Sequence, residues 1–143
     1  MARKLKTKGV SYWTKKLDTV FSQYIRLKYA GPNGMVQCFT CKKIRHYKDS
    51  MHCGHFHDRK WMGVRWDEDN VRPQCAYCNT YRAGRGPDFA VYLLEEIGKD
   101  RMDALFKKRL HLWCPADLEQ MYDEYRVKVK ELEKHVNRLN VLS

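Results

Sequence analysis

The chain has 143 residues and a formal net charge of +11, from 28 Lys and Arg against 17 Asp and Glu. Hydrophobic residues make up 43% and aromatic residues 13%, which excludes a disordered chain and leaves room for one domain with a modest core. No apolar run approaches the roughly 20 residues of a membrane span, and no signal-peptide core opens the chain. The positive charge favours nucleic acid as a partner over an anionic membrane surface. A cytoplasmic protein with reduced thiols is therefore expected.

The N-terminal region is predicted to be a basic arm followed by a helix. Residues 1–10 contain no acidic residue and four cations, Arg3, Lys4, Lys6 and Lys8. They are predicted either to lie along phosphates or to be a solvated terminus. A helix is predicted from Ser11, its capping residue, to the turn at 31–34. Its apolar face, predicted to pack on the domain, comprises Trp13, Leu17, Val20, Phe21, Tyr24 and Leu27.

Two Cys-x-x-Cys pairs, at 38–41 and 75–78, bracket residues 42–74. Each pair forms a tight knuckle that points both sulfurs inward, so two pairs supply the four thiolates of a tetrahedral structural zinc. One Zn²⁺ is therefore predicted on Cys38, Cys41, Cys75 and Cys78. The two remaining cysteines, Cys53 and Cys114, are predicted to be small buried hydrophobes.

The segment around the knuckles is predicted to be β-rich. The first knuckle should lie on a short hairpin, and residues 50–57 should form a strand. Residues 63–66 are predicted as a second strand or an extended loop, followed by a turn at 67–70. A helix is predicted to start at Asn79 and run to about residue 83. This order of strand, strand and helix is typical of a small ββα unit.

The C-terminal part is predicted to be helical. One helix spans 89–97 and ends at Gly98, a second spans 100–112, and a third covers 115–141 with Pro115 in its first turn. Apolar residues of the third alternate four and three apart, which is a heptad seam: Leu118, Tyr122, Tyr125, Val129, Leu132, Val136 and Leu139. The seam is predicted either to pair two copies of the chain or to pack along its own domain.

With these residues in view, the chain resembles the HNH (ββα-metal) nucleases and, more closely, the phage NinG/Rap recombination nucleases. The resemblance rests on Phe-Ser-Gln-Tyr-Ile-Arg-Leu (21–27), Cys-Gly-His-Phe (53–56), Arg-Trp-Asp-Glu-Asp-Asn (65–70), Gln-Cys-x-x-Cys-Asn (74–79) and Phe-x-x-Tyr-Leu-x-x-x-Ile-Gly (89–98). It implies an α+β fold: a small zinc-stapled ββα-metal core within 11–112, surrounded by helices, and a long C-terminal helix that is a candidate dimerisation element.

The resemblance also implies site residues. His55 corresponds to the general base, Asn70 to the residue that braces the ββ loop, and Asn79 to a ligand of the catalytic metal. An Asn directly after the second knuckle resembles the endonuclease VII class, which resolves branched DNA. That class places an Asp just before the base, whereas this chain has Gly54.

The second metal ligand is therefore open, with four candidates: His52, His55, His57 and Asp67. Alternatively, His55 binds the metal and His57 or His52 accepts the proton. His57 is favoured as the companion of His55, because alternate residues of a regular strand share one face.

Hydrolysis of a phosphodiester needs an activated water and charge neutralisation, which a neutral histidine and Mg²⁺ or Mn²⁺ can supply. Cations that flank the candidate site are predicted to bind DNA phosphates: Arg59, Lys60, Arg65, Arg72, Arg82 and Arg85.

The sequence thus predicts a metal-dependent HNH endonuclease that acts on branched recombination intermediates (a Holliday junction resolvase-like activity) as a homodimer, in the host cytoplasm if it is a phage protein. The alternatives are a general or nicking HNH endonuclease, a non-catalytic zinc-ribbon DNA-binding protein, and a protein-interaction adaptor that uses the C-terminal helix.

Overall fold

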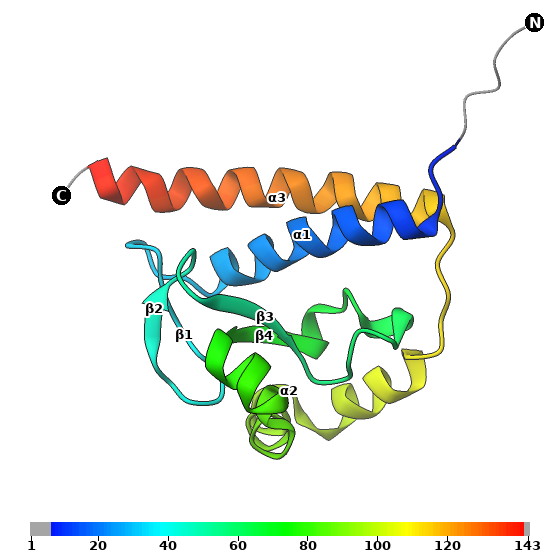
Figure 1. Cartoon of the computed structure of the whole chain (residues 1–143), viewed down its shortest axis with the longest axis horizontal. Helices are drawn as coiled ribbons and strands as arrows, with labels where there is room; N and C mark the ends of the chain where they lie inside the picture. The colour runs from blue at the N-terminus through cyan, green and yellow to red at the C-terminus, as the bar shows by residue number, and fades with distance from the viewer. Residues whose placement is uncertain (1–6, 142–143) are drawn as a thin grey trace, which may run out of the picture.

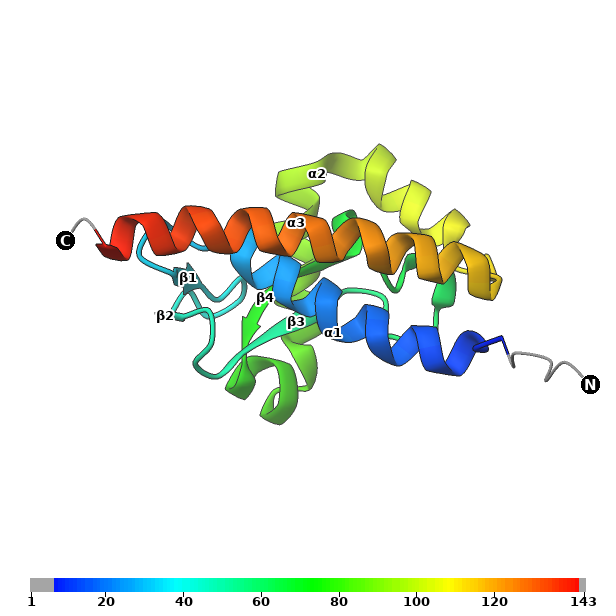
Figure 2. The ribbon, with the colours of Figure 1, turned by 90° about the horizontal axis from the view of Figure 1, so that it is seen from above.

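Two long helices lie side by side on one face of the protein. In the computed structural model, which describes residues 7–141, α1 spans Val10–Lys28 and α3 spans Pro115–Val141 (Figures 1 and 2). Their apolar faces meet: the ring centroids of Phe21 and Tyr125 lie 5.0 Å apart, and Trp13 packs on Tyr122 at 5.8 Å. The heptad seam of α3 therefore packs along its own domain, as one of the two alternatives predicted. The side chain of Leu139 lies outside the described residues.

The β structure consists of two small antiparallel hairpins. β1 (Met35–Gln37) pairs with β2 (Ile44–His46), and the first cysteine knuckle lies between them, as predicted. β3 (Met51–His55) pairs with β4 (Val71–Cys75), so that His52 lies opposite Gln74 and His55 opposite Val71. The connection between β3 and β4 contains two single-turn 3-10 helices, Met62–Val64 and Glu68–Asn70.

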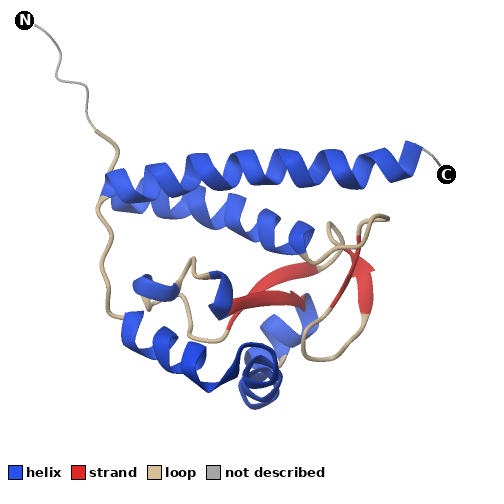
Figure 3. Ribbon diagram, turned by 180° about the vertical axis from the view of Figure 1, so that it is seen from behind, coloured by secondary structure: helices blue, strands red, loops and turns tan. Residues whose placement is uncertain are grey.

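A kinked helix lies on the other side of the β3–β4 hairpin. β4 leads into a short π-helix, Tyr77–Tyr81, a 3-10 turn, Ala83–Arg85, and then α2, Gly86–Lys108. Gly98 has φ 79° and ψ 168° and breaks α2 into two pieces, where the sequence predicted a helix end. The hairpin thus lies between the α1/α3 pair and α2 (Figures 1 and 3). The predicted α+β class with a long C-terminal helix is confirmed.

Two packed clusters hold these layers together. The larger joins α1 and α3 to β3 and β4 through Leu17, Phe21, Ile25, Val71 and Leu118, all nearly or fully buried. The smaller packs the first knuckle and the β3–β4 connection on α2 through Phe39, Val64, Phe89, Leu93 and Leu105. The larger cluster thus packs on the β3–β4 hairpin itself, and the smaller one packs on the connection between its strands, so the hairpin is held from two sides.

Several predicted boundaries were wrong. α1 begins at Val10 and is capped by the extended backbone of Gly9 rather than by Ser11. Residues 63–66 are neither a strand nor an extended loop, because they comprise the end of a 3-10 helix and a turn. Gly63 lies so close to the backbone of Lys108 that a β-carbon there would overlap it. The helix predicted to open at Asn79 begins at Tyr77. α2 starts at Gly86 and ends at Lys108, short of residue 112.

The predicted basic arm lies largely outside the described residues, since Arg3, Lys4 and Lys6 precede residue 7. Lys8 is described, and its ammonium lies 5.0 Å from the centroid of the Tyr12 ring. None of the described helices combines the length and apolar character needed to cross a membrane.

Candidate metal centre and histidine site

The four knuckle cysteines form one cluster. The sulfurs of Cys38, Cys41, Cys75 and Cys78 all lie within 4.8 Å of one another, and Cys41 Sγ is 3.7 Å from Cys75 Sγ. Four thiolates at about 2.3 Å around a tetrahedral zinc lie roughly 3.8 Å apart. The cluster therefore has the ligand set and the size that a structural zinc needs.

Backbone hydrogen bonds hold the two knuckles together and act on the Cys38 thiol. The Cys78 N–H donates to Cys75 Sγ at 3.5 Å, and the Phe39 N–H donates to the Pro73 carbonyl at 2.9 Å, which ties the first knuckle to β4. Burial raises the pKa of the Cys38 thiol, but hydrogen bonds with the backbone of Cys41 and Cys75 outweigh it and lower that pKa to about 6. The Cys38 thiol is therefore largely a thiolate at neutral pH, the form that binds metal. Burial has the opposite effect on two other thiols: it raises the pKa of Cys75 and raises that of Cys41 to about 12.

The two other cysteines differ from each other. Cys53 is buried on β3 beneath α1, and burial raises its pKa to about 12, so the predicted role of a small buried hydrophobe is confirmed. Cys114 is exposed, so the same prediction was wrong there. Its N–H and Sγ both contact Asp117 Oδ2, at the start of α3.

His55 closes β3 with its ring largely buried. Its Nε2 lies 2.8 Å from the Arg65 carbonyl, which can only accept, so Nε2 carries the proton of the neutral ring. Burial lowers the pKa of His55. The ring is therefore held in one tautomer and is neutral at neutral pH, as a proton acceptor must be.

Asn70 braces the connection that leads away from His55. It is fully buried, its Oδ1 accepts from the His57 N–H at 2.8 Å, and its Nδ2 donates to the carbonyls of His57 and Val64, both at 3.0 Å. The bracing contacts expected from the resemblance are thus present. All of its amide atoms are used within the protein, which leaves none for substrate.

His52, rather than His57, lies with the candidate site residues. His52 Nδ1 is 3.1 Å from Asn79 Nδ2, which joins β3 to the π-helix after the second knuckle. His57 instead packs edge-on against Phe56, and burial followed by the charge of Arg109 lowers its pKa. The prediction that His57 accompanies His55 was wrong, because β3 ends at His55 and its alternation does not continue to residue 57.

Gly54 is explained by its neighbour Gln74. A β-carbon at position 54 would overlap Gln74 Oε1, and Gln74 is itself fully buried. Its Nε2 donates to Thr40 Oγ1 at 3.0 Å and to the Gly84 carbonyl at 2.8 Å. The side chain of Gln74 therefore occupies the space that an Asp at position 54 would need.

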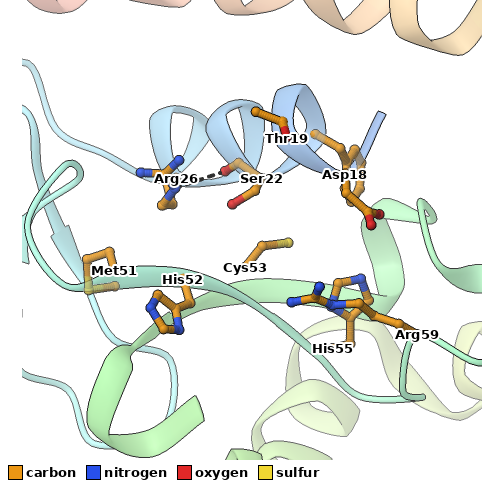
Figure 4. Close-up of a pocket in the computed structure, with 10 residues that line it drawn as sticks. Asp18, Thr19, Ser22, Arg26, Met51, His52, Cys53, His55 and Arg59 are labelled. Atoms are coloured by element: carbon orange, nitrogen blue, oxygen red, sulfur yellow. Dashed lines mark hydrogen bonds between the residues drawn. The ribbon is translucent and has the colours of Figure 1, made fainter. Parts of the chain in front are cut away.

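Two cavities meet at His55. A groove of about 410 Å³ lies between α1 and β3, lined among others by Ser22, Arg26, His52, His55 and Arg59 (Figure 4). A smaller cavity of about 290 Å³ is lined by His55 and Arg59 together with Asp58, Asn79 and Gly84. Asp58 was missed in the sequence, although the His57-Asp58 pair beside a candidate base could have pointed to it.

The predicted DNA-binding cations fall into two groups. Arg65 pairs with Asp18 at 2.6 Å, and Arg72 is buried and pairs with Glu96 at 2.9 Å, so both serve the fold. Arg59 lines both cavities, and Lys60 and Arg82 are exposed. Arg85 lies 3.9 Å from Asp88. Asp67 caps the 3-10 turn at Asp69 and pairs with Lys108 at 3.2 Å, so it does not join His55 and Asn79.

The described fold and the four-cysteine cluster define an α+β protein with a cysteine cluster that could hold a metal ion such as zinc. The family model described as "Bacteriophage Lambda NinG protein" matches residues 1–135, and the chain belongs to this phage family. It is 27% identical over 132 residues to "Protein ninG" of Salmonella phage P22, and 26% identical to those of Escherichia phages lambda and 933W. These alignments cover 91% of this chain but only 62–63% of the relatives. No solved structure matches.

Proposed function

We propose that this chain is a metal-dependent DNA endonuclease with HNH-type chemistry, acting on branched recombination intermediates. The observation that carries the proposal is the state of His55: a neutral imidazole, fixed by Arg65, at the junction of two cavities that also contain Arg59 and Asn79. An imidazole anchored in this way is suited to accept a proton from an attacking water, a role that contributes roughly 10²–10⁴-fold to a rate.

The neighbouring side chains have complementary tasks. Arg59, which lines both cavities, would hold the scissile phosphate against His55. Asn70 would keep His55 and Arg59 in position by fixing the loop that follows β3. The cysteine cluster would hold the π-helix that carries Asn79, because Asn79 directly follows Cys78.

A divalent ion would be held on the smaller cavity by oxygen ligands, which Mg²⁺ prefers. Asn79 would offer its amide oxygen, because its Nδ2 donates to His52 Nδ1 at 3.1 Å, so His52 would orient Asn79. Asp58, on the same cavity as Asn79, would add a carboxylate in place of the Asp that Gly54 excludes. Mg²⁺ or Mn²⁺ bound there would neutralise charge on the phosphate and on the leaving oxygen.

Branched DNA as the substrate rests on the resemblance to recombination nucleases and on the exposed cations, which bind phosphates without reading bases. Resolution of a junction needs two cuts on opposing strands, so two copies would act together in the host cytoplasm. Since α1 covers the heptad seam of α3, such a dimer would use another surface.

The test compares cleavage of a labelled four-way junction with that of a matched linear duplex, in Mg²⁺, Mn²⁺ or EDTA. His55→Ala, checked for zinc content and DNA binding, is the matched inactive variant. Metal-dependent cutting of the junction that disappears in His55→Ala would support the proposal. Equal cutting of both substrates would indicate a general nuclease, and tight binding without cutting in any metal would leave a zinc-ribbon DNA-binding protein.

Binding of the divalent ion can be measured separately from catalysis. Titration of Mn²⁺ into zinc-loaded His55→Ala, with junction DNA present, should give one site by calorimetry. Adding His52→Ala or Asp58→Asn should weaken it about tenfold or more, while His57→Ala should leave it unchanged. Equal affinity in all of these variants would contradict the assignment of His52 and Asp58.

A further inference from the structure

A second, strongly basic groove lies along the seam between α1 and α3. It has a volume of about 540 Å³, and its lining includes four cations, Lys15, Lys16, Arg126 and Lys130, but one acid, Glu133. None of the six cations predicted from the sequence to bind DNA belongs to it. The long helices therefore carry a concentrated positive surface in addition to packing the domain.

The charges of this α1/α3 groove are not balanced within the described residues. Lys15, Lys16 and Lys130 form no ion pair there, and Arg126 approaches Asp123 only at 4.0 Å. Lys16 and Arg126 instead lie over the ring of Tyr122, at 5.5 and 5.8 Å from its centroid. The like charges of Lys16 and Arg126 repel each other at this ring, and an anion bound in the groove would reduce that repulsion.

The α1/α3 groove adjoins the groove that holds His55, because Thr19 lines both. Lys15 and Lys16 line the first groove, and Ser22 and Arg26 line the second, where Figure 4 shows them. At 100° per residue these positions fall on neighbouring faces of α1, so a ligand can pass from one groove to the other over Thr19. Figure 2 shows α3 and α1 side by side along this path.

We propose that the α1/α3 groove binds the sugar–phosphate backbone of the DNA arm that leaves the cut site. The width of α1, about 10–12 Å with its side chains, corresponds to about three base pairs at 3.4 Å each. The groove would thus grip phosphates about three base pairs from the bond at His55. This inference rests on the proposed function, which supplies the DNA and the position of the cut.

The test is the salt dependence of binding to a linear duplex and to a four-way junction, with no divalent ion added so that the DNA stays intact. The variant carries Lys15→Gln, Lys16→Gln, Arg126→Gln and Lys130→Gln. Each lost phosphate contact should reduce the slope of log K against log salt by about 0.9, so the slope should fall by about three to four, with binding about tenfold or more weaker at 100 mM salt.

A control variant removes the same four charges elsewhere: Lys43→Gln, Lys48→Gln, Lys99→Gln and Lys107→Gln, all at exposed positions. It should keep the slope within about one unit of the wild-type protein. Lys130→Glu alone, at an exposed site of α3, provides a second variant should the fourfold one unfold, and its slope should fall by about one or more.

An unchanged slope in the groove variants, or an equal loss in the control, would overturn the inference. Cleavage at His55 would still stand in that case, because it is measured separately. Wild-type protein that does not bind DNA at all would overturn this inference and the proposed function together.

Discussion

Asn70 offers the sharpest test of how the candidate site is held together. Asn70→Ala removes one accepted and two donated hydrogen bonds from a fully buried position and leaves the His57 N–H and two carbonyls without partners. At about 1 kcal/mol for each bond, the free energy of unfolding should fall by about 3 kcal/mol. For a domain of this size, that lowers the Tm by about 10 °C.

Asn70→Asp tests the same buried position through the direction in which stability changes with pH. The new carboxylate can still accept from the His57 N–H, but its second oxygen faces the carbonyls of His57 and Val64 in a buried site. Its folded pKa should therefore lie above the unfolded value of about 3.9, so the neutral acid is the form the fold tolerates. Stability relative to the wild-type protein is then lost as pH rises from about 4 through the folded pKa.

The assay is thermal unfolding of both variants and the wild-type protein at pH 5 and pH 8, with zinc content measured in each sample. Asn79→Ala, which removes a single contact with His52, is the matched control and should cost about 1 kcal/mol or less. A Tm for Asn70→Ala within 2 °C of the wild-type protein would refute the reasoning. So would an Asn70→Asp deficit that is no larger at pH 8 than at pH 5.

Three further outcomes are expected. Cys75→Ser should lose bound zinc and unfold or melt far below the wild-type protein, while Cys114→Ser keeps one zinc per chain, as measured by metal analysis and circular dichroism. The cleavage rate should fall on acidification with a midpoint below pH 6.5, because burial lowers the pKa of His55; an acidic midpoint above pH 7 contradicts this. Gly54→Asp should lose about 1–3 kcal/mol in urea unfolding and gain no metal affinity, because the new side chain meets Gln74; an unchanged midpoint contradicts the overlap.

The sequence was sufficient for features that depend on local spacing. Each Cys-x-x-Cys pair predicts its own knuckle, because that geometry is set within four residues, and four thiolates in two knuckles are what one tetrahedral zinc needs. Gly98 and Pro115 mark a helix break and a helix start, because their backbone preferences act locally. The long C-terminal helix follows from an unbroken heptad pattern, although the pattern alone could not name its partner, α1.

Features that depend on tertiary contacts were not predictable in this way. Arg65 and Arg72 look like phosphate ligands in the sequence, but acids from α1 and α2 neutralise them. The parity argument for His57 failed because the length of β3 is set by its pairing with β4 rather than by its own residues. The α1/α3 groove was hidden for the same reason, since its cations come from helices about 100 residues apart in the chain.

The contacts of Gln74 explain why this chain departs from the pattern it resembles at position 54. Through Thr40 and Gly84, Gln74 joins the first knuckle to the turn that lines the smaller cavity. An Asp at position 54 would need the same space, so a carboxylate there and the link through Gln74 exclude each other. Asp58 lies beyond β3, where no such link competes. The chain can thus keep a connection from the cysteine cluster to the cavity and still place a carboxylate, Asp58, on the cavity that Asn79 lines.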